Sequence, residues 1–310
     1  MIRAGLLALG LAGPAGAEGL GGQALCAAAW EKGSGQIGAL GTVTTQGLAQ
    51  DGDWCVVERP VVDIDGQYVP DWRMDRLRFR GSALGWIATG TGLPEGFEVS
   101  VEGLRLVVQT GNAQMDWLFA AQARPNGIDA EAAFAWDPDA RVLRLERLSV
   151  DFPGENLVEA SARLTGVDLS SDAAIEKTFT GFALTKAELN VTTHGLFEWY
   201  ALMTLGPVML PPEGDMEAAA QGIRADLVAL VGDLPGTSVS QASKAALVAL
   251  IGELPNPSGD LSVALRADPG LGPERLADQV ATGLPDTLAD AAPVLQGVTV
   301  DVGWSHVDAP

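Results

Sequence analysis

The sequence predicts an α+β fold in which a curved antiparallel β-sheet, a meander, packs against C-terminal helices. Three observations support this class. Residues 72–192 mostly alternate apolar and polar side chains, residues from 194 onward mostly follow a helical period, and strand-like segments return after the helices. Because 47% of the residues are hydrophobic, the chain can also form a substantial core.

The N-terminus, residues 1–17, has the pattern of a signal peptide. Arg3 precedes an apolar run from Ala4 to Gly13, and Ala15-Gly16-Ala17 supplies the small residues that signal peptidase accepts. This run is too short to cross a bilayer, which takes about twenty residues, and no later segment predicts a transmembrane span. We therefore expect cleavage after Ala17 and a periplasmic or secreted chain. The alternative is a buried N-terminal strand or helix.

The next segment, residues 18–71, carries the two cysteines of the chain, Cys26 and Cys55. Export places them in an oxidising compartment, where cysteines pair, so we expect a disulfide between them. A free thiol and a metal ligand are the alternatives, but neither cysteine has a histidine near it in the sequence. The residues from Cys26 to Glu31 have a helical pattern.

The charge balance is strongly acidic, with 40 Asp and Glu against 19 Lys and Arg and a net charge of −21. Such a surface repels nucleic acid and anionic lipid headgroups, so no nucleic-acid partner is expected. The acidic residues are scattered singly, which is typical of a solvated surface. The more specific alternatives are that the acidic surface binds a basic partner protein or divalent cations.

The middle section, residues 72–192, predicts hairpins. Residues 128–136 alternate as a half-buried strand requires, Asp137-Pro138-Asp139-Ala140 supplies a turn, and residues 141–152 form the return strand. Pro153-Gly154-Glu155-Asn156 turns again before a strand that ends near Leu164.

One apolar spacing occurs three times in this section: alternation, a slip of one residue, then alternation again. A slip would turn the apolar side chains to the other face unless a bulge absorbs it, so we expect bent strands, and Gly103 suits the first bulge. The three copies are Val99, Val101, Leu104 and Leu106; Leu143, Leu145, Leu148 and Val150; and Phe182, Leu184, Ala187 and Leu189.

The last section, residues 193–310, predicts helices near 214–232 and 239–252 and strands near 261–265 and 298–302. Leu227-Val-Ala-Leu-Val-Gly-Asp-Leu-Pro235 is repeated as Leu247-Val-Ala-Leu-Ile-Gly-Glu-Leu-Pro255. Gly followed by Pro predicts a helix end in both copies. The expected buried stripes are Met216, Ala220, Ile223, Leu227 and Leu230 in the first helix and Val239, Ala242, Ala246, Leu250 and Leu254 in the second.

No catalytic, metal or cofactor motif is recognised. Residues 33–38 fit G-x-G-x-x-G, but a helical segment precedes them where a nucleotide site needs a strand. Residues 63–66 resemble only a fragment of a calcium loop, so a turn is the better interpretation. A pair of His194 with Glu198 is conceivable, but a capping or half-buried histidine is the simpler interpretation.

Aromatic side chains are numerous on the predicted strands. They are typical of a core filled under the C-terminal helices, and the functional alternative is an apolar groove that those helices cover only in part. The candidate groove residues are Phe79, Phe97, Phe134, Trp136 and Phe152.

Three stretches resemble the AsmA-type and related repetitive β families of Gram-negative envelope proteins. They are Arg141-Val-Leu-Arg-Leu-Glu-Arg-Leu-Ser-Val150, Glu159-Ala-Ser-Ala-Arg-Leu-Thr-Gly166 and Lys186-Ala-Glu-Leu-Asn-Val-Thr-Thr-His-Gly195-Leu196. The resemblance covers residues 75–200 and implies a β groove that shelters lipid acyl chains.

The sequence therefore predicts a non-catalytic envelope protein that binds an apolar ligand or lipid, with another envelope protein as a further partner. The first alternative is a structural or interaction module with a filled core and an acidic surface. A hydrolase built on a pair of carboxylates is a second alternative, because linear sequence does not show which acidic residues meet.

Overall fold

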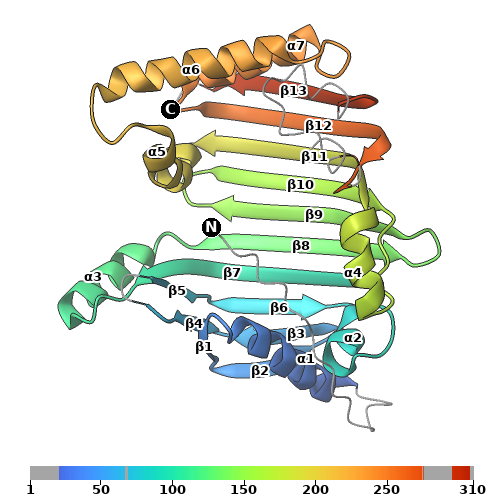
Figure 1. Ribbon diagram of the computed structural model, residues 1–310. Helices are drawn as coiled ribbons and strands as arrows, with labels where there is room; N and C mark the ends of the chain where they lie inside the picture. Colours follow the sequence, from blue (N-terminus) through green and yellow to red (C-terminus); the bar gives the residue numbers. More distant parts are fainter. Residues whose placement is uncertain (1–20, 67–68, 274, 276–294, 308–310) are drawn as a thin grey trace. The chain divides into compact units, whose positions relative to one another are not determined.

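The computed structural model describes residues 21–66, 69–273, 275 and 295–307 (Figure 1). The predicted α+β class is confirmed: a large, open antiparallel β-sheet is accompanied by C-terminal helices that pack against it. The chain divides into two compact units, residues 1–139 with 168–176 and residues 140–167 with 177–310. The division falls inside the predicted meander. The predicted signal peptide, residues 1–17, lies outside the described residues.

The first unit consists mainly of short strands and three helices. In chain order its elements are α1 (Gly22–Ile37), β1 (Gly41–Thr44), β2 (Gly47–Asp51), β3 (Trp54–Glu58), β4 (Val61–Ile64), β5 (Pro70–Arg73), β6 (Arg76–Arg80), α2 (Ala83–Thr89), β7 (Gly96–Val108), α3 (Ala113–Ala123) and β8 (Ile128–Asp137).

The core of the first unit lies around the predicted disulfide, which is confirmed. Cys26 of α1 and Cys55 of β3 are joined, with 5.3 Å between their Cα atoms. Val57, Phe79 and Leu84 are buried in the same cluster, so helices α1 and α2 close the apolar side of strands β3 and β6. The helix that the sequence predicts at Cys26 is also present.

Strand β7 bends where the sequence predicts a bulge. Residues Glu98–Glu102 pair with β6, residues Arg105–Val108 pair with β5, and the register with β8 shifts between Val101 and Leu104. Gly103 lies at the bend with φ +63°, a left-handed conformation that glycine adopts without steric cost. One strand thereby joins two branches of the first unit's sheet.

The second unit is a meander followed by helices and two returning strands. Its elements are β9 (Val142–Phe152), β10 (Asn156–Thr165), β11 (Ala183–His194), the π-helix η1 (Phe197–Ala201), α5 (Leu202–Met209), α6 (Met216–Asp233), α7 (Gln241–Glu253), β12 (Ser258–Leu271) and β13 (Val298–His306). Helix α4 (Asp172–Gly181) contributes residues to both units. The strands pair antiparallel in the order β9-β10-β11-β12-β13.

The other two predicted bends are present as well. The β9–β10 register shifts between Ala160 and Ala162, opposite the predicted slip in β9. In β11, a shift against β10 and β12 falls between Leu184 and Lys186. Both shifts keep the apolar residues before and after the bend on one face.

Helices α6 and α7 end alike, but their buried apolar residues are not those of the predicted stripes. These residues are Val231 and Ile251, which are equivalent positions of the repeated segment. Val239, which was predicted in the second stripe, is buried but lies before α7. Leu230 is 48% exposed and Met216 is also exposed, so the predicted stripe of α6 is wrong at both positions.

The helix ends also differ from the prediction. The glycines of the repeat lie inside the helices, and each helix ends one residue later at Asp233 or Glu253. The next residues, Leu234 and Leu254, are extended. Each precedes a proline, and a residue before proline is disfavoured in the helical conformation.

Helix α7 and the segment before it cover the edge of β13 (Figure 1). The Val300 amide donates to the Ser238 carbonyl oxygen at 2.7 Å, and the Val302 amide donates to Ser243 Oγ at 3.0 Å. These bonds satisfy edge donors that could otherwise pair with another chain. Across the described ranges, no helix is long and apolar enough to span a membrane.

Candidate functional site: the apolar face of strands β9–β13

The strand register of the second unit places apolar side chains on one face of the sheet. Residues that are paired across adjacent strands point to the same side, so each row of partners can be followed from β9 to β13. The rows are Val150, Val158, Val191, Leu261 and Trp304; Leu148, Ala160, Leu189, Val263 and Val302; and Leu145, Ala162, Ala187, Leu265 and Val300. We call these three rows the apolar face.

The opposite side of the same strands is polar. One row there contains Ser149, Glu159, Asn190, Ser262 and Gly303, and another begins with Arg163, Lys186 and Arg266. The sheet of the second unit is therefore amphipathic, with one face suited to water and one suited to an apolar layer.

Burial shows that this apolar layer is incomplete. In the first unit, where helices close the sheet, Val57 is 0% and Cys55 is 1% exposed. Every residue of the apolar face, by contrast, is only partly buried. A sheet face packed against a second layer reaches the burial of the first unit, so the described elements leave the apolar face partly open to solvent.

The segment η1–α5 borders the apolar face at one end of the strands. The ring of Tyr200 lies 4.8 Å from the ring of Phe152, which has the same orientation along β9 as Val150 and Leu148. Burial raises the pKa of the Tyr200 phenol. The aromatic pair thus extends the face to the exposed helix α5.

The candidate groove residues predicted from sequence lie in different surroundings. Phe79 and Trp136 are 6% and 3% exposed and so offer no surface to a ligand. Phe97 and Phe134 form a ring pair with centroids 5.9 Å apart in the first unit. Phe152 lies in the second unit, at the end of the apolar face. Apart from Phe152, the apolar side chains of β9 to β13 were not among the predicted groove residues.

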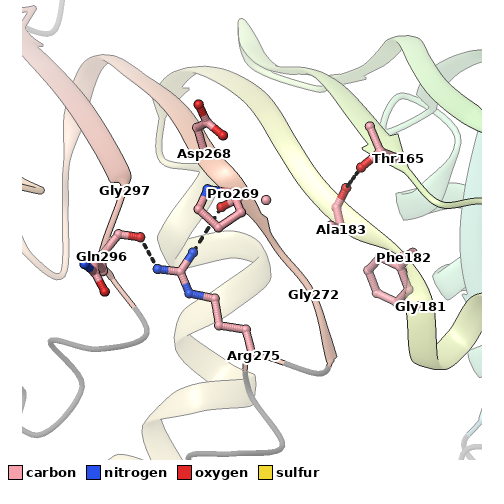
Figure 2. A pocket seen from close by; sticks show the side chains of 11 residues that line it. Thr165, Gly181, Phe182, Ala183, Asp268, Pro269, Gly272, Arg275, Gln296 and Gly297 are labelled. Atoms are coloured by element: carbon pink, nitrogen blue, oxygen red, sulfur yellow. Dashed lines mark hydrogen bonds between the residues drawn. The ribbon is translucent and has the colours of Figure 1, made fainter.

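At the opposite end of the strands, a depression of about 980 Å³ lies between the end of β10, the start of β11 and the end of β12 (Figure 2). Arg275 donates to the carbonyl oxygens of Pro269 and Gln296, the former at 3.1 Å. Asp268 and Arg275 are the charged residues among the described lining groups. This lining offers no nucleophile beside a base, so it does not resemble a catalytic site.

The two histidines of the chain lie near the start of β12. His194 Nδ1 is 3.2 Å from Ser258 Oγ, and His306 Nδ1 is 3.0 Å from Glu253 Oε2. Burial opposes the charge of Glu253, but hydrogen bonds from Trp304, His306 and Ser258 outweigh it and lower the pKa of that carboxyl. Ser258 Oγ donates to the Val307 carbonyl, so its hydroxyl hydrogen is engaged with the backbone.

The polar side chains at this end of the sheet therefore connect the strand ends to one another. His194 is the last residue of β11, at a strand-to-helix junction as predicted, while Glu198 Oε1 accepts from Asn256 Nδ2 at 2.7 Å. His194 and Glu198 therefore have separate partners. Within the described part of the chain, no group of three or more His, Cys, Asp or Glu residues could hold a metal ion.

The secondary structure around the G-x-G-x-x-G stretch does not fit a nucleotide site. Residues 33–37 belong to the end of helix α1, and Gly38 is its C-terminal cap. A dinucleotide site needs these glycines between a strand and the start of a helix. Comparison with known proteins adds no assignment, because no family model matches the sequence and no curated protein matches it significantly.

Proposed function

We propose that this protein is an exported, non-catalytic protein of the cell envelope that holds an apolar ligand, such as a lipid acyl chain, against the apolar face of β9–β13. The observation that carries the proposal is the continuity of that face across the strands, combined with its partial burial. An extended chain of methylene groups can contact a continuous apolar surface along its whole length and remove that surface from water.

The disulfide supports the export part of the proposal. Disulfides persist in the periplasm and outside the cell and are rare in the reducing cytosol. The Cys26–Cys55 bond is buried in the core of the first unit, so it belongs to the folded structure of the protein and is shielded from solvent reductants.

The polar chemistry of the second unit supports a binding role over a catalytic one. The hydroxyl and carboxylate groups near the start of β12 bond to backbone and side-chain partners that join strand ends. Binding of an acyl chain needs apolar contact area and few polar groups, which describes the apolar face.

The experiment compares two neighbouring residues of β11 that point to opposite faces. Leu189→Glu places a carboxylate on the apolar face, and Asn190→Glu places the same charge on the polar face. We expect wild type and Asn190→Glu to bind the fluorescent fatty acid cis-parinaric acid, and Leu189→Glu to bind it about tenfold or more weakly, because a buried charge is strongly disfavoured.

Ala160→Phe is a second variant, which alters the apolar face without introducing a charge. It fills part of the apolar face with an apolar ring and should also weaken binding. Protein purified from its own host should release lipid on organic extraction. If wild type binds no fatty acid and carries no lipid, or if both face variants bind as wild type does, the proposal is refuted. Ligand-free protein that is dimeric would favour the interaction module instead.

A further inference from the structure

Among the described residues of the second unit, the segment η1–α5 contains strongly exposed apolar side chains. Trp199 is 77% and Val208 is 84% exposed, and Leu205 and Met209 are exposed as well. A single exposed apolar side chain is ordinary, but Leu205, Val208 and Met209 have the i, i+3, i+4 spacing that places side chains on one side of a helix, which is a feature of interaction sites.

The sequence of this segment is also unusually poor in charge for so acidic a chain. Residues 199–212 contain no charged side chain, and they are flanked by Glu198 and Glu213. No lysine or arginine occurs between Lys186 and Arg224. The segment therefore has no cation with which to attract an acidic protein surface or an anionic lipid headgroup.

We propose that η1–α5 is a membrane-docking element that inserts Trp199, Val208 and Met209 into the interfacial region of an electrically neutral lipid bilayer. Tryptophan favours the boundary between headgroups and acyl chains, and aliphatic side chains favour the layer just beneath it. The uncharged segment loses little hydration energy on entering that layer, whereas the flanking carboxylates stay at the water side.

Its position makes the segment an entrance to the apolar face. Tyr200 contacts Phe152 at the end of that face, so an acyl chain leaving the bilayer beside α5 reaches the strands without crossing water. This part of the inference rests on the proposed ligand-binding function, whereas the docking itself does not.

The first unit contains a similar arrangement of a bent strand followed by an exposed helix. Strand β7 bends like β11 and is followed by the short helix α3, whose Met115, Trp117 and Leu118 are exposed. An exposed tryptophan helix after a bent strand thus occurs twice in the chain, although the sequences of α3 and α5 differ.

The test is flotation of the full mature chain with phosphatidylcholine vesicles, with and without added phosphatidylglycerol. Wild type should float with the neutral vesicles and no better with the anionic ones. Trp199→Ala and Val208→Glu should each reduce the bound fraction about tenfold or more. Leu230→Glu, which places the same charge at an exposed apolar position of α6, should float as wild type does.

Quenching of tryptophan fluorescence by brominated acyl chains reports how deeply the segment enters the bilayer. The vesicle-dependent quenching of tryptophan fluorescence should be reduced in Trp199→Phe. Wild type that stays in solution, that floats only with anionic vesicles, or that loses self-association in Val208→Glu would overturn the inference. The last result would assign the segment to contact with a second copy of the chain.

The two proposals fail separately. Val208→Glu should bind cis-parinaric acid in solution as wild type does, because the apolar face is unchanged. Leu189→Glu should still float with neutral vesicles while losing the fatty acid. Flotation without fatty-acid binding refutes the ligand site alone, and fatty-acid binding without flotation refutes the docking element alone.

Discussion

Removal of the Cys26–Cys55 disulfide should destabilise the first unit by several kcal/mol. The bond links residues 29 apart in the sequence. In the chain-entropy model, closing a loop of this length in the unfolded chain stabilises the folded state by about 3.6 kcal/mol at 25 °C. Both cysteines are almost completely buried, so replacing them with alanine also removes two sulfur atoms from the core. The alanine double variant should therefore lose at least the entropic amount.

The assay is equilibrium urea unfolding of the oxidised protein, the protein in reductant and the double alanine variant. Reduction alone isolates the loss of the crosslink, because both sulfur atoms stay in the core. Reductant added to the alanine variant is the control and should change nothing. Hydrogen exchange of the β3 amides assigns the loss to the first unit. A loss below about 1 kcal/mol on reduction would refute the reasoning, since the unfolded loop would then not be constrained by the bond.

Two further predictions concern the second unit. Ile251→Ala should destabilise it by about 2–5 kcal/mol because Ile251 is buried, whereas Leu230→Ala should cost less than about 1 kcal/mol; equal losses in thermal unfolding would contradict the burial of α7. Glu253, whose pKa is lowered from 4.5, should contribute stability above that value and lose it as the pH falls through the lowered pKa. The melting temperatures of wild type and Glu253→Gln should therefore converge on acidification, and a constant difference would contradict this linkage.

The sequence predicted the elements of the fold better than their partners. Period-two alternation located the strands, the bend at Gly103 followed from one glycine in a slipped apolar pattern, and the disulfide followed from the cysteine count. These signals are local or depend on the number of residues of one type. The short strands β1 to β5 were missed because each is only four or five residues long, too short for alternation to stand out.

The helical stripes were misplaced for a different reason. A stripe of apolar residues predicts which side of a helix is buried only if the helix packs against a broad surface. Helix α7 instead packs along the edge strand β13, and α6 packs mainly against α7. Less of each helix is covered, so Leu230 is exposed while its neighbour Val231 is buried.

The residues of the candidate site were also only partly predicted from the sequence. Leu261, Val263 and Val302 were recognised as strand residues, but only the register shows that they continue the rows begun by Leu148 and Val150. Aromatic residues drew attention to Phe79 and Trp136 because large side chains are conspicuous in a sequence. Those two side chains are buried in the first unit, and the apolar face is mostly made of aliphatic side chains.

In the second unit, the edge strand of the sheet is bonded to other segments whereas the apolar face is open, and this difference bears on function. At β13, the amides of Val300 and Val302 bond to Ser238 and Ser243, so these two positions are not free to pair with another strand. The apolar face has no comparable cover among the described elements. In the proposed function, these bonds hinder extension of the sheet into a second copy of the chain while the open face holds an acyl chain.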